Sequence, residues 1–198
     1  RAVMDAAGGG LPEDQVRELF VGILDLVRRL HLKVRHCGLD GRNIFVRDAG
    51  EVWITQLVTF GMVEDDVFGP EGLPRAGAPY LAPELDQYSA RVGPATDVYS
   101  LGVLLYEALC GCPPVGRYEL PSTLRQDIPA ELDDVVELAL AGSPSERFQS
   151  VDDLAVALEN AFAAGGRNED KAKIARPLII GLTVLLAIVV AVAFALRP

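Results

Sequence analysis

The sequence predicts a mainly helical α+β domain that carries one small β-hairpin and is followed by a single transmembrane helix. Three observations lead to this prediction. Four stretches before residue 167 have the apolar spacing or the end signals of helices. Two short β-type runs lie between the first and the second of these stretches. Residues 178–196 are an unbroken apolar segment.

The first helix is expected to begin at Pro12. Proline suits the first helical position, and the acidic Glu13 and Asp14 complement the positive end of the helix dipole. Apolar residues then recur at the i, i+3, i+4, i+7 spacing of a buried stripe: Val16, Leu19, Phe20, Ile23, Leu24 and Val27. One face of this helix should therefore pack against a core.

The remaining elements follow from shorter signals. The runs 44–46 and 52–55 are separated by RDAGE, whose Gly50 favours a hairpin. Helices are predicted over about 96–109, stopped by Gly111, and over about 130–140. A fourth helix should start at Ser150, which has Asp153 at capping-box spacing, and should run out at the glycines 165 and 166.

Residues 178–196 are long enough to cross a bilayer. As a helix they would extend about 28 Å, close to the hydrocarbon thickness of a membrane. A buried core helix is the alternative, but a core helix of this length is rarely apolar on every face. We therefore divide the chain into a domain over 1–163, a juxtamembrane linker over 164–177 and a transmembrane helix over 178–196.

Basic residues precede this segment: Arg167, Lys171, Lys173 and Arg176. Lys and Arg beside a span favour the cytoplasmic side of a membrane. We therefore expect a single-pass protein of the inner or plasma membrane, with residues 1–177 in the cytoplasm.

Charge and cysteine content exclude two kinds of site. The chain has 28 Asp and Glu against 18 Lys and Arg, so no basic surface is available for nucleic acid. Cys37, Cys110 and Cys112 lack the spacing of a disulfide framework and are expected to be thiols in a reducing compartment. No second cysteine pair or His cluster completes a zinc site around the C-x-C pair.

Four short motifs stand in one order along the chain. They are HCGLDGRN at 36–43, YLAPEL at 80–85, DVYSLGVLLYEALCGCPP at 97–114 and SPSERFQS at 143–150. Each motif alone is weak, but together, at this spacing, they resemble the C-terminal lobe of eukaryotic-type protein kinases, in the membrane-anchored bacterial serine/threonine style. The resemblance covers about residues 8–163.

The resemblance implies structural roles for five residues. Glu84 and Arg147 would pair and tie the activation segment to the helical core. Asp97 would accept hydrogen bonds from the backbone of the catalytic loop, and His36 would pack within that loop. Gly102 matches the glycine of the D-x4-G helix, which begins at Asp97.

The chemical residues of the family are changed. Its catalytic base falls at Gly38, which has no side chain, and its catalytic-loop Lys falls at Asp40, which places negative charge where a phosphate would approach. The metal ligand Asn43 is retained, but the metal Asp of D-F-G falls at Gln56. Shifting the alignment to residues 59–61, Thr-Phe-Gly, still supplies no acid. Asp40 acting as the base instead is an alternative that the sequence leaves open.

Two further departures concern regulation and the upstream lobe. Residues 62–79 contain no Ser, Thr or Tyr to phosphorylate, and Ala78 replaces the family's Thr. The family's N-terminal lobe, with its Gly-rich loop and phosphate Lys, has no counterpart in this chain, which begins near the hinge. The sequence leaves open whether such a lobe precedes Arg1 or a sensor domain follows Pro198.

These features favour a membrane-anchored pseudokinase that binds or scaffolds in signalling, with no cofactor required. The alternative is a divergent active serine/threonine kinase with its N-lobe upstream, and only that reading requires ATP and Mg²⁺. An intermediate reading is a domain that binds nucleotide without metal and without transfer. A non-kinase membrane protein is a third class. The expected partners are unidentified proteins and the membrane, with no nucleic acid.

Overall fold

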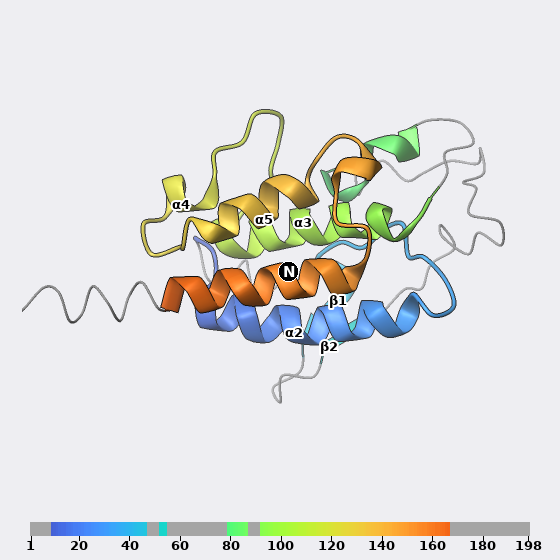
Figure 1. Ribbon diagram of the computed structural model, residues 1–198, viewed down its shortest axis with the longest axis horizontal. Helices are drawn as coiled ribbons and strands as arrows, with labels where there is room; N and C mark the ends of the chain where they lie inside the picture. The colour runs from blue at the N-terminus through green and yellow to red at the C-terminus, as the bar shows by residue number, and fades with distance from the viewer. Residues whose placement is uncertain (1–8, 47–51, 55–78, 87–91, 167–198) are drawn as a thin grey trace, which may run out of the picture.

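Of the 198 residues, the computed structural model describes 9–46, 52–54, 79–86 and 92–166 (Figure 1). The elements follow in the order α2 (Glu13–Leu30), β1 (Ile44–Val46), β2 (Val52–Ile54), η2 (Pro83–Asp86), α3 (Pro94–Cys110), α4 (Pro121–Leu124), α5 (Glu131–Ala139), η3 (Pro144–Glu146) and a last helix over 151–166. The prediction of a mainly helical domain with one small hairpin is confirmed.

Helix α3 runs through the centre of the described residues (Figure 1). All of its residues from 95 to 109 are buried except the half-buried Tyr99. It contacts α2, α4, α5 and η3. At its end Gly111 adopts a left-handed conformation with φ +83°, and its N–H donates to the Glu107 carbonyl at 2.7 Å. Because most residues avoid this conformation, Gly111 ends the helix as predicted.

Helix α2 buries one stripe against this centre, as its spacing predicted. The buried residues are Val16, Phe20, Ile23, Leu24 and Val27, and Leu19 packs partly buried beside them. The helix begins at Glu13, so Pro12 immediately precedes the helix instead of opening it.

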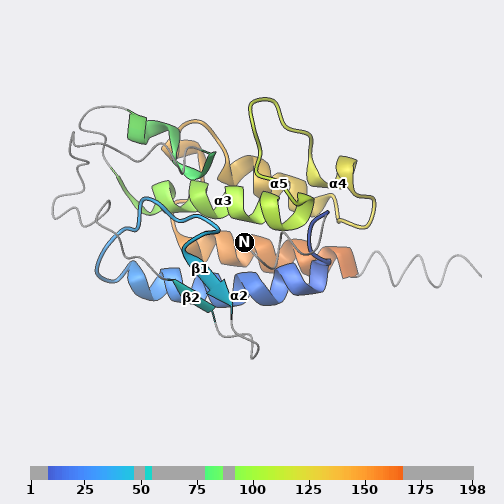
Figure 2. The ribbon, with the colours of Figure 1, turned by 180° about the vertical axis from the view of Figure 1, so that it is seen from behind.

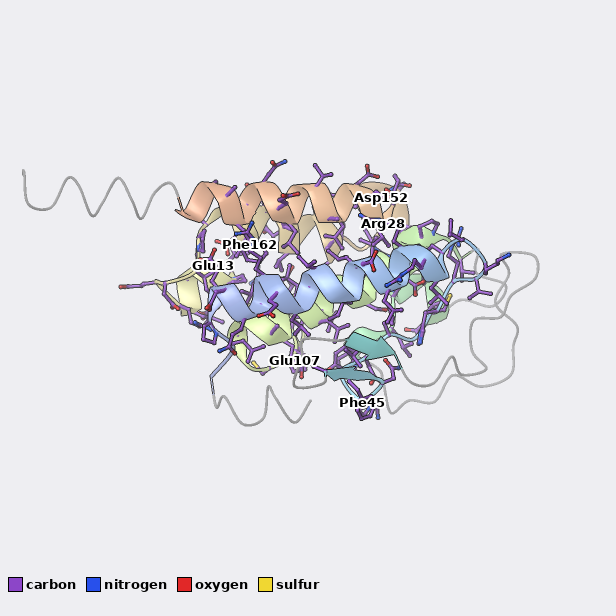
Figure 3. All side chains as sticks on the ribbon, turned by 90° about the horizontal axis from the view of Figure 1, so that it is seen from below. Glu13, Arg28, Phe45, Glu107, Asp152 and Phe162 are labelled. Atoms are coloured by element: carbon purple, nitrogen blue, oxygen red, sulfur yellow. The ribbon has the colours of Figure 1, made fainter. Side chains whose placement is uncertain are left out.

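The hairpin lies against the side of α2, as seen from behind in Figure 2. Its strands are antiparallel, with Ile44 opposite Ile54, Phe45 opposite Trp53 and Val46 opposite Val52. Both predicted runs therefore pair with each other. Ile44 is buried in the core, whereas Phe45 is 53% exposed and points away from the helices (Figure 3).

The last helix lies beside α2 (Figures 1 and 3). Its predicted cap is present: the Asp153 N–H donates to Ser150 Oγ at 3.0 Å, and Ser150 Oγ donates to Asp153 Oδ2 at 2.7 Å. The helix continues through both Gly165 and Gly166. Cβ atoms at Gly165 would stand 2.2 Å from Pro129 Cγ, so this glycine serves close packing and is not a stop signal.

Several sequence predictions fall beyond the described residues or on their edges. The apolar segment 178–196, most of the linker before it, residue 56 and the segment 62–78 lie outside them. Within the described ranges, no helix combines the length and apolar character needed to cross a membrane. The sequence missed the short helices η2, α4 and η3, and set the bounds of α3 and α5 one or two residues off. The cysteines 37, 110 and 112 form no disulfide.

Gly102 sets how closely α3 and α5 approach. A Cβ atom added at Gly102 would lie 2.7 Å from the Ala139 Cβ and 3.2 Å from the Leu140 Cδ2. The first distance is shorter than van der Waals contact allows, so any larger residue at 102 must push the two helices apart.

We expect Gly102→Ala to lower the free energy of unfolding by about 1–3 kcal/mol, because overpacking outweighs the better helix propensity of alanine. Denaturant unfolding followed by circular dichroism measures the change. The matched control is Gly142→Ala, since a Cβ atom at Gly142 would meet no heavy atom within 4 Å. Equal stability of the two variants would contradict this description of the α3–α5 contact.

Candidate functional site

Asp97 fixes the start of the loop that runs from His36 to Asn43. Its carboxylate is fully buried on α3. Oδ2 accepts a hydrogen bond from the His36 backbone N–H at 2.8 Å, and Oδ1 accepts one from the Cys37 N–H at 2.6 Å. The Nε2 atom of His31 also lies 2.8 Å from Oδ2. One side chain of the central helix therefore holds two successive backbone amides of the loop.

Cys37 turns the chain at this point with a φ of +57°, which is uncommon for a residue with a Cβ atom. Its side chain is fully buried and packs with Ala82, Leu85 and Val92. In the H-R-D motif of the family this position is Arg. The contact between the loop and the 79–86 segment is thus apolar at this point.

The other end of the loop is closed by Asn43. Its Nδ2 donates to the Gly38 carbonyl at 3.0 Å, and its Oδ1 accepts from the Asp40 N–H at 3.1 Å. Leu39, between these two residues, is fully buried in the main core. Asn43 therefore works as a bracket across the loop, with both of its polar atoms engaged.

Asp40 is held by Arg42. Asp40 Oδ1 accepts from the Arg42 N–H at 2.7 Å, and Oδ2 accepts from Nη2 at 2.5 Å and from Nε at 3.1 Å. The hydrogen bond to Asp40 raises the pKa of Arg42, so the guanidinium stays charged. The negative charge that the sequence placed here is consequently offset by a neighbouring cation.

Gly38 has open space where a side chain would stand. A Cβ atom there would meet no heavy atom within 4 Å, and its φ does not lie in the left-handed region. Neither crowding nor backbone conformation thus requires glycine at this position.

Glu84 and Arg147 form a buried ion pair. Arg147 Nη1 and Nη2 donate to the two Glu84 oxygens at 3.0 and 2.8 Å, and Thr96 Oγ1 donates to Glu84 Oε1 at 3.0 Å. The remaining donors of Arg147 reach the carbonyls of Ala95, Ala141 and Gly142. The guanidinium also lies 4.9 Å from the ring centre of Tyr99, whose pKa is raised by burial.

Tyr80 provides a second tie between the 79–86 segment and α3. Its hydroxyl donates to Glu107 Oε2 at 2.6 Å, and its carbonyl accepts from Ser100 Oγ at 2.7 Å. Glu107 is only 4% exposed, so this hydrogen bond is formed away from water.

These contacts agree with one outcome of the comparisons with known proteins. The family model described as the protein kinase domain matches residues 2–157. The chain belongs to the protein kinase family.

Its relatives include serine/threonine kinases of plants and bacteria. It is 31% identical over 123 residues to the CBL-interacting serine/threonine-protein kinase 21 of Arabidopsis thaliana, covering 61% of this chain and 29% of the relative. It is 32% identical over 126 residues to the serine/threonine-protein kinase PknA of Mycobacterium tuberculosis, covering 58% and 29%. The chain thus spans less than a third of these relatives' length.

A solved structure shares the fold. The Mycobacterium tuberculosis PknI kinase domain matches with a TM-score of 0.59 at 24% identity, over 77% of this chain and 56% of that one. The shared part contains the central helix and the loop that it holds.

The structure gathers most of the residues singled out from the sequence. His36, Gly38, Asp40 and Asn43 lie on one loop above Asp97, and Glu84 meets Arg147 on the other side of α3. Gly102 lies apart, at the contact with α5, and Gln56 is outside the described residues.

Sequence reasoning missed five residues of this kinase lobe: His31, Cys37, Arg42, Tyr80 and Glu107. One signal could have found some of them. Helix α3 is buried nearly all round yet carries polar residues at 96, 97, 100 and 107. Because buried polar groups need hydrogen-bond partners, each of these positions predicts a contact with another segment.

The residues of this lobe do not fit the Mg²⁺–ATP chemistry of the family. Active kinases hold their metal ions with the Asn of the catalytic loop and the Asp of D-F-G. Here the Asn43 amide brackets its own loop, and the sequence offers the neutral Gln56 for the Asp. A hard divalent cation prefers carboxylate oxygens, so this donor set is a poor one.

We expect Glu84→Ala to lower the free energy of unfolding by about 3–5 kcal/mol, because it leaves the Arg147 charge buried without its partner. The double variant Glu84→Leu/Arg147→Met should lose less than Glu84→Ala alone, since it removes both charges. Denaturant unfolding of the two variants gives the comparison.

The control for this pair is the exposed ion pair between Arg28 and Asp152, with its atoms 2.5 Å apart. Arg28→Ala should cost less than about 1 kcal/mol, as exposed pairs usually do. A Glu84→Ala variant as mildly affected as Arg28→Ala would show that the buried pair does not hold the 79–86 segment.

Proposed function

We propose that this chain is part of a membrane-anchored pseudokinase, whose kinase-like lobe acts in signalling as a binding or scaffold module. The observation that carries the proposal is Gly38. It occupies the position of the family's base, on a loop whose supporting hydrogen bonds are in place. Without a side chain, Gly38 cannot accept the proton of a substrate hydroxyl.

The loss at Gly38 is not forced by the fold. An aspartate would have room there, and the backbone is not in a conformation that favours glycine. The fold would accept the acid, so its replacement supports loss of the chemistry rather than a structural need.

Asp40 is unsuited to take over the role of the base. All three hydrogen bonds to its carboxylate come from Arg42, and the carboxylate is 7% exposed as a residue. A carboxylate that is bound by a guanidinium is stabilised in its charged form and is a weaker base. Moving it to a substrate would also require breaking that pair.

What the lobe retains is suited to binding. The loop, the 79–86 segment and α3 are joined by the contacts of Asp97, Glu84 and Tyr80, which keep a fixed surface. The formal net charge of −10 would steer protein partners with basic surfaces toward it. We propose residues 178–196 as the anchor and the inner or plasma membrane as the location, with residues 1–177 in the cytoplasm.

A second candidate function is a divergent active serine/threonine kinase. The printed names of the relatives at 31% and 32% identity favour it. That candidate needs ATP, Mg²⁺ and a base other than Gly38, supplied by chain that adjoins this sequence.

The natural full-length product should transfer no phosphate from ATP to itself or to a generic basic substrate in the presence of Mg²⁺. The physical reason is the missing base and metal carboxylate. Incorporation of γ-labelled phosphate is the measurement, and a thermal-shift series with ATP, with and without Mg²⁺, detects nucleotide binding without transfer. Transfer that disappears in Asp40→Asn, with folding intact, would establish the active-kinase candidate instead.

The chain should stay with the membrane pellet through an alkaline carbonate wash, because residues 178–196 span the bilayer. Leu186→Arg together with Val190→Arg should release it, since each charge costs about 2.5–3.5 kcal/mol near the centre of a span. Leu186→Ala with Val190→Ala is the matched control and should remain in the pellet. Release of the unaltered chain by the wash would refute the anchor while leaving the pseudokinase proposal standing.

A further inference from the structure

Helix α2 and the helix over 151–166 leave a groove between them, of about 300 Å³. Figure 3 shows the two helices side by side. The apolar part of its lining consists of Val21, Leu24, Ala155, Leu158 and Phe162. Val21 is 65% exposed on the α2 side. The groove is therefore an apolar strip between two helices with room for further side chains.

The two helices present opposite charge beside this strip. Helix α2 contributes Arg17 and Arg28 to the lining. The helix over 151–166 contains no Lys or Arg and contributes Glu159, with Asp152 one turn before the groove residue 155. One border of the groove is thus basic and the other acidic.

The charge on each border is only partly used within one chain. Arg28 Nε lies 2.5 Å from Asp152 Oδ1, which closes one end of the groove. Asp25, which also lines the groove, is paired with Arg29 on its own helix. Within the part of the chain that the structure describes, Arg17 and Glu159 make no ion pair.

The spacing of charge and valine matches between the two borders. The contact of Arg28 with Asp152 makes the two helices antiparallel, as Figure 3 shows. Val21 lies about 6 Å along α2 from Arg17, and Val156 lies about 4.5 Å along its helix from Glu159, at 1.5 Å per residue. Val156 is 60% exposed, like Val21.

We propose that this face is an interface between two copies of this chain, related by a two-fold axis parallel to the groove. That rotation places α2 of each copy over the 151–166 helix of the other. Arg17 then meets Glu159 of the second copy twice, and Val21 meets Val156 of the second copy twice. A two-fold axis across the groove would instead stack α2 on α2 and bring Arg17 toward Arg28 of the second copy, which charge repulsion opposes.

The chosen axis also fits the position of the chain ends. Because the axis is parallel to the helices, Gly166 lies at the same end of the pair in both copies. Both chains then continue in the same direction, as two anchors in one membrane require. This last point rests on the proposed anchor, whereas the groove and its charges do not. Confinement to one membrane would raise the effective concentration and favour a weak interface.

Charge exchange between copies tests the proposal. The full chain is placed in lipid vesicles, and association is measured by energy transfer between copies labelled on the exposed Cys112. Burial raises the pKa of the Cys110 thiol to about 11, so labelling near neutral pH avoids it. Arg17→Glu alone and Glu159→Arg alone should each weaken association about tenfold or more, because each self-pair contains two like-charge contacts. An equimolar mixture of the two variants should restore it, because every contact between unlike copies is again between opposite charges.

The mixture separates contacts between copies from contacts within one chain, which mixing cannot repair. Arg117→Glu, an exposed charge reversal away from the groove, is the matched control and should associate normally. If the chain does not enter membranes, sedimentation in solution must show the same pattern of four samples, so failure of the anchor is distinguishable. Absence of association by the unaltered chain, or a mixture no better than the single variants, would overturn the proposal.

Discussion

The buried carboxylate of Asp97 is the constraint on which the candidate site depends. A carboxylate removed from water must be matched by hydrogen-bond donors, and two of those it uses are the backbone amides of His36 and Cys37. His31, at the end of α2, completes the set. The loop is therefore positioned by a residue on another helix that has no part in phosphate chemistry. A site built in this way can lose its chemical side chains without losing its shape.

Helix α3 extends this principle along its length. Its buried polar residues each reach a different segment: Thr96 reaches Glu84, Asp97 the loop, and Ser100 and Glu107 the backbone and hydroxyl of Tyr80. Since an unsatisfied polar group in the interior costs more than its hydrogen bond contributes, these contacts must form together. The central helix thus ties the loop and the 79–86 segment into one unit, which is the property that a binding module needs.

The sequence predicted the helices and the hairpin because periodicity and end signals are local. It also predicted the pairing of Glu84 with Arg147, although only through resemblance to a family, because no local pattern relates residues 63 positions apart. It could not predict that Arg42 binds Asp40, since that contact depends on how the loop turns between them. Nor could it show that Gly38 has room for a side chain, because free space is a property of the neighbours. The short helices η2, α4 and η3 were missed because each is too brief to show a period.

Native-state hydrogen exchange of the His36 and Cys37 amides tests most directly whether Asp97 keeps the loop in its frame. If it does, both amides exchange only through global unfolding, and they become fast in Asp97→Ala at a denaturant concentration where the rest of α3 is still protected. Exchange of these two amides in the unaltered protein as fast as that of the exposed Arg117 would contradict the account. The loop would then be neither a catalytic site nor a fixed surface.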